Sequence, residues 1–252
     1  MCGRYAIIDG RKVLDTFARL TVRDTTALFA DLPRYNASPL QKLPVFAVRD
    51  GALVVRKMQW WLIPHWSKDG KPSATTFNAK AETVAQSRLF APYFRASRCL
   101  VPADAFYEWT KIVPVADGPK KPREEKQPMC IVMKDRSPFM FAGLFSVWKN
   151  EKGEELPSFT ILTTTPNALM SGIHSRMPVI LPEKHHAQWL DREFKDTNEL
   201  NKLLVPYPSE AMNAYPVSRY VSNSRNEGKE CMEALNADSL PGNAASGPPR
   251  RA

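Results

Sequence analysis

The second residue of the chain is a cysteine, and its position gives it a chemistry that an internal cysteine lacks. Its small side chain favours removal of the initiator Met1, which would leave Cys2 with an α-amine and a thiol on adjacent carbons. Such groups have pKa values near ~7.7 and ~8.5, so both are partly deprotonated at neutral pH. The amine can capture an aldehyde as an imine, and the sulfur can then close on the same carbon to form a thiazolidine. The alternative is a small buried apolar residue or a frayed terminus.

A carboxylate set among aromatic residues is the second candidate. The segment Phe106-Tyr107-Glu108-Trp109 is typical of a strand, in which Glu108 shares a face with Phe106, while Tyr107 and Trp109 share the other face. Removal from water would raise the pKa of this carboxyl and suit it to proton transfer near neutral pH. The alternative is an edge-strand glutamate in water.

Two polar segments supply further candidates. His174 and Arg176 lie two residues apart before a Pro-led strand, where they could clamp a phosphate and exchange a proton. A loop histidine bonded to a backbone carbonyl is the alternative. Asn78 could hold the nucleophile or the substrate while Lys80 contacts a phosphate. Alternatively, Asn78 caps a helix and Lys80 is a surface charge.

The tryptophans have two interpretations. Trp60, Trp61 and Trp66 fall in one aromatic cluster, and single aromatic residues are usually part of a core. They can also serve as stacking platforms for unpaired bases, an interpretation that we extend to Trp66 and Trp109 alone. His186 lies in a charged predicted helix and is expected to face solvent.

Composition limits the function classes. The 252 residues are 43% hydrophobic, enough for a sizeable core, and carry a net charge of +9. That excess suits a polyanion partner, although a merely soluble basic protein is as good an explanation. The four cysteines are far apart with no CxxC pair, which argues against a zinc site or disulfides and for a reducing, cytoplasmic setting. No run suits a membrane span or a signal peptide, and we expect no cofactor.

The hydrophobic pattern predicts an α+β fold with many short strands and short helices in a single domain. The domain is expected to span 2–235, with an exposed insertion at 111–127 and a disordered tail at 236–252. Asp50-Gly51 between two apolar runs predicts a hairpin. Residues 79–96 are expected to be helical in two pieces, 215–226 to be a loop, and 227–235 to be a short helix.

An ordered set of motifs resembles the SOS response-associated peptidase family, whose members process abasic sites on single-stranded DNA. The motifs are MCGRY at the start, RYNASP at 34–39, WLIPHW at 61–66, NAKAET at 78–83, RCLVPADAFYEW at 98–109, FAGLFSVW at 141–148, TTTPNALMSGIHSRMPVIL at 163–181 and PVSRYVSNSRN at 216–226. The resemblance implies an open barrel-like mixed β core flanked by short helices, with a basic channel for single-stranded DNA.

The resemblance also implies roles for individual residues. Cys2, once exposed, would link through a thiazolidine to the ring-opened abasic sugar, a lyase-like reaction that protects the lesion. Asn78 would position Cys2, Glu108 would move protons, and His174 would aid ring opening and hold a phosphate. The implied DNA contacts are Arg4, Trp66, Lys80, Arg88, Trp109, Thr163 and Arg176. The family often has Arg at the position of Lys80 and Gly at that of Trp61.

The expected partner is single-stranded DNA with abasic sites, bound by a monomer without a membrane or a metal. Two other functions stay open. One is a cysteine peptidase with an N-terminal nucleophile, for which removal of Met1 would be an autoproteolytic cleavage. The other is a non-catalytic binder of single-stranded or modified DNA. Reaction with an aldehyde-bearing oligonucleotide separates both from the crosslinking function.

Overall fold

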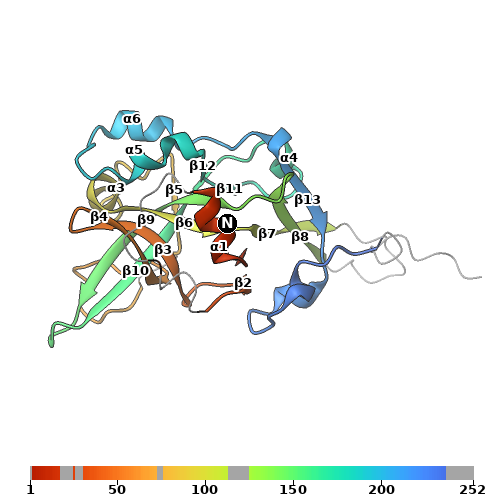
Figure 1. Ribbon diagram of the computed structural model, residues 1–252, viewed down its shortest axis with the longest axis horizontal. Coiled ribbons are helices and arrows are strands. Elements are labelled where there is room, and N and C mark those ends of the chain that lie inside the picture. Colours follow the sequence, from red (N-terminus) through yellow and green to blue (C-terminus); the bar gives the residue numbers. More distant parts are fainter. Residues whose placement is uncertain (1, 18–24, 26–30, 73–75, 113–124, 237–252) are drawn as a thin grey trace, which may run out of the picture.

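In the part of the chain that the structure describes, more residues lie in strands than in helices (Figure 1). A computed structural model describes residues 2–17, 25, 31–72, 76–112 and 125–236. Most of the predicted insertion at 111–127 and nearly all of the predicted tail at 236–252 lie outside the described residues. The predictions about those two segments therefore stay predictions.

The first sheet has five strands and contains the N-terminal strand near its middle. All of its pairings are antiparallel. In spatial order its strands are β13 (Met212–Pro216), β8 (Glu125–Met133), β7 (Ala105–Ile112), β1 (Tyr5–Ile7) and β2 (Arg34–Ala37). This order places the residues just before β1 between β7 and β2, so the start of the chain enters the interior.

The second sheet curls into a ring. Its order is β11 (Met177–Pro178), β10 (Glu155–Thr164), β4 (Ala52–Trp60), β3 (Lys42–Arg49), β6 (Arg98–Ala103), β9 (Phe139–Lys149) and β12 (Ile180–Leu181), with β5 (Asn78–Lys80) on β10. A further pairing of β9 with β10 joins β10, β4, β3, β6 and β9 into a closed five-stranded circuit. The predicted α+β class with a barrel-like mixed β core is confirmed.

Local sequence explains the tightest turn. The β3–β4 hairpin closes through Asp50 and Gly51, whose φ angles are 49° and 73°. Two successive residues with positive φ fit the right-handed twist of paired strands, and Asp-Gly tolerates them best. The hairpin predicted at this dipeptide is confirmed.

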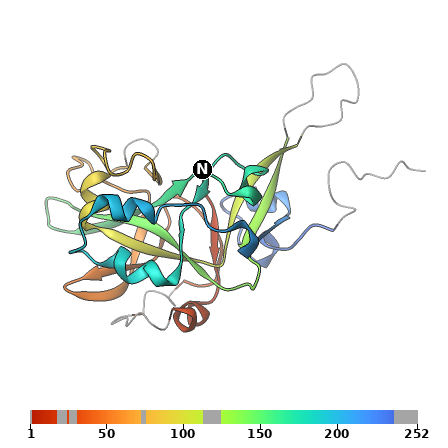
Figure 2. The ribbon, with the colours of Figure 1, turned by 90° about the horizontal axis from the view of Figure 1, so that it is seen from above.

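The helices are short. They are α1 (Gly10–Thr16), α3 (Ala91–Ala96), α4 (Ala168–Ser171), α5 (His186–Leu190) and α6 (Thr197–Lys202), with 3₁₀ turns η1 (Glu183–His185), η2 (Ser209–Ala211), η3 (Arg219–Ser222) and η4 (Lys229–Cys231). Figures 1 and 2 show α3, α5 and α6 at one end of the molecule, away from α4 and β13. Among the described residues, no helix has the length and apolar character to cross a bilayer.

Two apolar clusters lie on opposite faces of β7. The larger fills the ring and includes Cys2, Tyr5 and Phe106. The smaller includes Tyr107, and Trp109 packs against it. The predicted alternation of Phe106 and Glu108 with Tyr107 and Trp109 is therefore confirmed.

Some local predictions were wrong. Residues 78–80 form β5 instead of a helix, because their backbone pairs in parallel with β10, and only 91–96 are α-helical in that stretch. Asn78 is consequently no helix cap. The predicted loop at 215–226 begins inside β13 and includes η3, and the helix predicted at 227–235 is reduced to η4.

His186 was predicted to face solvent, and this was also wrong. It is 1% exposed, its Nε2 lies 2.9 Å from the Leu181 carbonyl oxygen, and its ring packs against Phe17. Burial lowers its pKa below the ordinary value, so the ring is held neutral.

Candidate functional site

Strand β1 carries Cys2 into the interior. The Tyr107 N–H donates to the Arg4 carbonyl at 3.0 Å, and Tyr5 stands opposite Phe106, which fixes the register of the N-terminus on β7. Cys2 is fully buried, and its Sγ lies 3.9 Å from the Arg4 carbonyl oxygen. Burial, and then the nearby carboxylate of Glu108, raise the pKa of the Cys2 thiol far above its ordinary value.

Glu108 is the buried carboxyl of the site. It comes from the middle of β7, points to the larger cluster and is only 3% exposed. Burial raises the pKa of this carboxyl, and the nearby imidazole of His174 partly opposes the rise. A carboxyl held in this way can carry a proton closer to neutral pH than an exposed glutamate can.

His174 faces Glu108 from a different part of the fold. It lies between α4 and β11, where its backbone N–H donates to the Met170 carbonyl at 2.8 Å. Its Nε2 stands 3.9 Å from Glu108 Oε2. Its Nδ1 lies 3.0 Å from the Arg176 N–H and 3.1 Å from the Arg176 carbonyl oxygen, so either neutral tautomer finds a backbone partner. These backbone contacts hold the ring in its orientation toward Glu108.

Asn78 lies one layer of side chains away from β1. The Tyr5 ring packs on Trp60 with centroids 5.2 Å apart, and Trp60 Nε1 donates to the Phe77 carbonyl at 2.9 Å. Asn78 follows Phe77; its Nδ2 donates to the carbonyls of Phe77 and Ile161 at 3.0 and 3.4 Å. Its Oδ1 is buried and accepts no hydrogen bond from any described residue. Since buried acceptors are normally satisfied, this oxygen is available to a donor that enters the site.

Arg176 links His174 to the edge of β10. Its two terminal nitrogens donate to the two Glu82 oxygens at 2.6 and 2.9 Å, and Nη2 also donates to the Thr163 carbonyl at 2.6 Å. Thr163 is buried and stands in register with exposed Lys80 on β5. The hydrogen bonds from Arg176 lower the pKa of Glu82 below its ordinary value. Glu82, which was not among the predicted site residues, therefore holds this guanidinium in place.

Arg4 has its donors largely engaged within the protein. Nη1 donates to Asn36 Oδ1 at 2.7 Å and to the Val221 carbonyl at 2.6 Å, and Nη2 donates to the Ser222 carbonyl at 3.0 Å. Its guanidinium lies 5.9 Å from the centre of the Trp109 ring, whose Nε1 donates to Ser222 Oγ. Arg4 and Trp109 thus form one unit beside Glu108.

The structure brings most of the predicted residues together but not all. Contacts connect Glu108 with His174, His174 with Arg176, Arg176 with Thr163, and Arg4 with Trp109. Trp66 is 61% exposed and Arg88 is exposed in the turn before α3. No contact within the described part of the chain ties either of them to this group.

Asn36 is a structural residue of the site that sequence reasoning missed. It is fully buried, accepts from Arg4 and donates from Nδ2 to the carbonyls of Val221, Asn223 and Asn226 at 2.9–3.2 Å. The sequence offered only its place in the RYNASP motif, which is typical of a turn.

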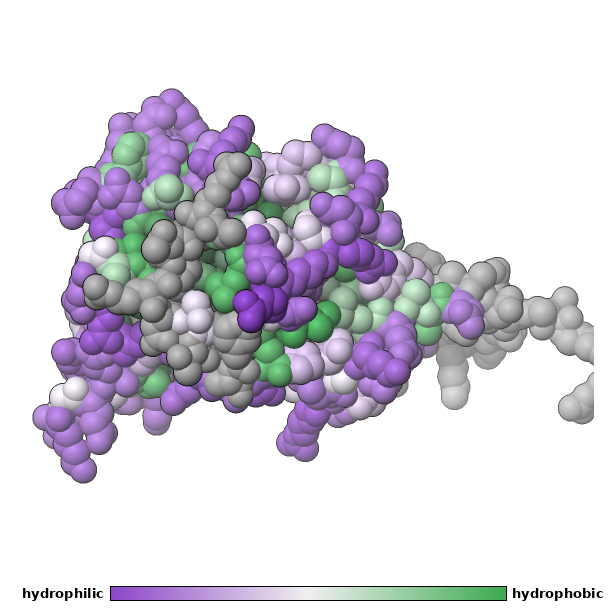
Figure 3. Space-filling view, in the orientation of Figure 1, coloured by the Kyte–Doolittle hydropathy of each residue, from purple (hydrophilic) through white to green (hydrophobic). Residues whose placement is uncertain are grey.

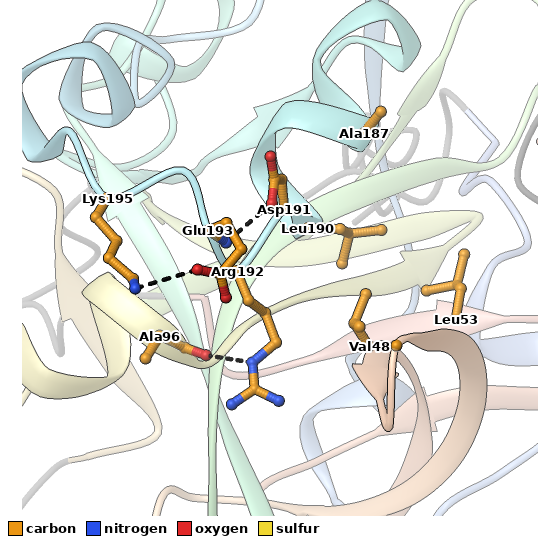
Figure 4. Close-up of a pocket in the computed structure, with 10 residues that line it drawn as sticks. Val48, Leu53, Ala96, Ala187, Leu190, Asp191, Arg192, Glu193 and Lys195 are labelled. Atoms are coloured by element: carbon orange, nitrogen blue, oxygen red, sulfur yellow. Dashed lines mark hydrogen bonds and ion pairs between the residues drawn. The ribbon is translucent and has the colours of Figure 1, made fainter.

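A surface cavity of the protein lies elsewhere. It has a volume of about 640 Å³ and is lined by Val48, Leu53, Leu190, Arg192 and neighbours (Figure 4). None of the four predicted catalytic residues lines it. Within the described residues no group of three or more His, Cys, Asp or Glu is placed to hold a metal ion.

Comparisons with known proteins identify the family of the chain. A family model described as SOS response associated peptidase (SRAP) matches residues 1–224, so the chain belongs to the SRAP family. The abasic site processing protein YoqW of Bacillus subtilis is 35% identical over 93% of this chain and 100% of that protein. The abasic site processing protein HMCES of Xenopus tropicalis is 32% identical over 81% of this chain and 66% of that protein.

A solved structure supports the fold. An X-ray structure of a protein from Bacteroides thetaiotaomicron is 26% identical and superposes with a TM-score of 0.75 over 93% of this chain and all of that one. The shared architecture therefore extends well beyond the motifs around Cys2.

Proposed function

We propose that this chain captures abasic sites in single-stranded DNA by a covalent bond to Cys2 after Met1 has been removed. The observation that carries the proposal is the convergence of Cys2, Glu108 and His174 at the start of β1, in a family whose relatives are named abasic site processing proteins. An abasic sugar opens to an aldehyde, which a 1,2-aminothiol captures.

The reaction follows from the chemistry of these groups. The Cys2 amine attacks the aldehyde carbon to give a carbinolamine, and loss of water gives an imine. Glu108 is placed to supply the proton that leaves with the water, because its raised pKa lets it hold one. The Cys2 sulfur then adds to the imine carbon, and the thiol proton passes to the nitrogen as the ring closes. His174 exchanges a proton with Glu108 and assists opening of the sugar ring.

The residues around Cys2 suit contacts to phosphates and to the bases on either side of the lesion, because the lesion itself has no base. Exposed Lys80 and Trp66 are proposed to contact phosphate and to stack on a base. Thr163 and Arg176 would lie beside the reacting sugar, with Glu82 orienting the guanidinium. For Arg4 we propose that it positions Trp109, because its donors are engaged by Asn36 and backbone carbonyls. A monomer in the cytoplasm that binds single-stranded DNA completes the proposal.

The names of the relatives, abasic site processing proteins, favour an aldehyde over a peptide as the substrate. In the chain that still carries Met1, burial and Glu108 raise the pKa of the Cys2 thiol, whereas a peptidase would need a lowered one once Met1 has left. Capture of an aldehyde does not require a stable thiolate, since the amine reacts first.

Intact-mass analysis after mixing the protein with an abasic single-stranded oligonucleotide tests the proposal. We expect one adduct per chain, absent in Cys2→Ala and in a protein whose terminus carries an uncleavable tag. Cys130→Ala is the matched control, because Cys130 is also buried but belongs to the smaller cluster. Normal crosslinking by the tagged protein would show that the free amine of Cys2 is not needed, and the proposed mechanism would be wrong.

A further inference from the structure

A second cavity lies on the barrel, away from the Cys2 region. It has a volume of about 360 Å³, within the roughly 300–1,000 Å³ of small-molecule sites. It opens between the β3–β4 hairpin and the C-terminal end of β9, and none of Cys2, Asn78, Glu108 or His174 lines it. Its chemistry is therefore independent of the proposed crosslinking.

The lining of this cavity combines apolar and charged side chains, which we call its floor and its rim. The floor comprises Ala47, Val54, Met58, Phe145 and Val147, and the polar residues His65, Tyr93, Ser97 and Ser146 also line the cavity. The rim carries four cationic side chains and two carboxylates, which leaves an excess of positive charge; they are Arg49, Arg56, Lys149, Arg192, Asp50 and Glu155. An apolar floor with a few convergent charged groups is typical of a ligand site.

One carboxylate is shared by three of the cations. Glu155 Oε2 lies 2.6 Å from Arg56 Nη2 and 3.9 Å from Arg49 Nη1, and Glu155 Oε1 lies 3.4 Å from Lys149 Nζ. These cations hold the pKa of Glu155 below its ordinary value, chiefly through the hydrogen bond from Arg56, so it stays ionised at neutral pH. Arg49 Nε also lies 3.6 Å from Asp50 Oδ2, so two carboxylates face these three cations, and Arg192 lines the cavity as a fourth cation. The four positive charges exceed the two negative ones, and a further anion would be attracted to the same place.

Arg192 adds a fourth cation from the other side. Its Nε donates to the Ala96 carbonyl at 3.1 Å, and its two terminal nitrogens point away from Asp191 and Glu193 (Figure 4). It lines both this cavity and the larger one. Figures 1 and 3 show that the β9–β10 hairpin beyond Lys149 extends from the body as a hydrophilic tip, so this side of the rim borders solvent.

We propose that this cavity binds a nucleoside phosphate, with the phosphate on the basic rim and the base against the apolar floor beside Phe145. A phosphate matches the planar, multiply donating guanidinium groups of Arg49, Arg56 and Arg192. A flat base matches the aromatic face and the neighbouring aliphatic side chains. The nucleotide belongs either to a DNA strand or to the free pool, and the two sources share this chemistry.

Titration with thymidine 5′-monophosphate, thymidine and a ten-nucleotide oligo-dT without abasic sites tests the proposal on the full chain. Amide NMR shifts on β3, β4 and β9 report the site directly. We expect saturable shifts with the monophosphate and none with thymidine. If the oligonucleotide alone produces them, the nucleotide is part of a strand. If neither phosphate-bearing probe shifts these residues, the proposal is wrong.

Two variants separate an anion site from a set of structural ion pairs. Lys149→Glu, at a side chain 62% exposed, should weaken binding about tenfold. Glu155→Gln should tighten it several-fold, because a competing negative charge is removed; failure to tighten would overturn the proposal. Arg49→Glu, 54% exposed, repeats the first test at a second position. Lys202→Glu on α6, 69% exposed and also paired to a glutamate, is the control and should change affinity less than twofold. Crosslinking at Cys2, measured separately, should be unchanged in all four variants.

Discussion

Two buried polar regions of this protein differ in how their charged side chains are bonded. Arg98, 2% exposed at the start of β6, donates from all three guanidinium nitrogens to backbone carbonyls; the acceptors are Trp189, Phe94, Arg95, Asp191 and Phe194. Glu108, 3% exposed, faces His174 across 3.9 Å, and Asn78 on β5 has a buried oxygen that no described residue bonds.

The difference distinguishes a residue that stabilises the fold from residues that are proposed to react. Arg98 on β6 bonds to α3, to α5 and to the chain after α5. All of these hydrogen bonds stabilise the same folded conformation. A reactive region must instead exchange protons and admit a substrate, so its polar groups cannot all be held by permanent partners. A buried acceptor without a partner, such as Asn78 Oδ1, is therefore one feature expected of a reactive region.

Removing the proton carrier should give the largest effect. Glu108→Gln keeps the shape of the side chain but cannot titrate, so crosslinking to abasic DNA should slow by about 10²–10⁴. DNA affinity should be nearly unchanged. The measurement is the crosslinking rate as a function of pH, with exposed Glu199→Gln on α6 as the control. Wild-type rates across the whole pH range would make Glu108 structural.

Arg98 should show the reverse pattern. Arg98→Met leaves several buried carbonyls without donors and should lower the free energy of unfolding by about 3 kcal/mol or more. The crosslinking rate per folded molecule should not change. Urea unfolding with Arg192→Met as the surface control measures the difference. A loss of rate without a loss of stability would reverse the distinction drawn between the two regions.

A smaller effect should appear in the pH dependence of stability. Burial raises the folded-state pKa of Glu108, so above the ordinary value near ~4.3 the unfolded chain has lost a proton that the folded chain keeps. The unfolded state then binds fewer protons, and stability falls as pH rises through the folded pKa. Glu108→Gln should remove this contribution, and its stability relative to wild type should be greater at pH 8 than at pH 5. The measurement is the free energy of unfolding in urea. If the difference between the variant and wild type is the same at both pH values, the folded-state pKa of Glu108 is not raised.

The sequence around Glu108 predicted its burial, whereas the sequence around Arg98 did not predict its hydrogen bonds. Alternation placed Glu108 with Phe106, and the aromatic neighbours indicated burial, because both depend on the two-residue period of a strand. Nothing local marks Arg98 as a residue that bonds carbonyls some 90 positions away, because α5 and the loop after it supply these acceptors.

Long-range pairing also explains the wrong prediction at Asn78. The segment 78–80 has only three residues, too few to show a strand period, and its partner in β10 lies about 80 residues later. Asn36 was missed for the same reason, since three of its partners lie between 221 and 226. The barrel-like fold could be predicted from the motifs, whereas these polar contacts follow only from the assembled chain.

The smallest effect tests whether a positive charge is engaged within the protein or available to DNA. Lys80 is exposed on β5, whereas Arg4 donates to Asn36 and to two backbone carbonyls. Each phosphate contact to single-stranded DNA contributes a slope of about −0.7 to the dependence of log affinity on log salt. Lys80→Ala should therefore flatten the slope by about 0.7 and leave stability unchanged. Arg4→Ala should keep the slope but lower stability, because Asn36 and the Val221 carbonyl lose a donor. Fluorescence anisotropy with an undamaged oligonucleotide at several salt concentrations measures the slopes, and a flatter slope for Arg4→Ala would place its guanidinium on a phosphate.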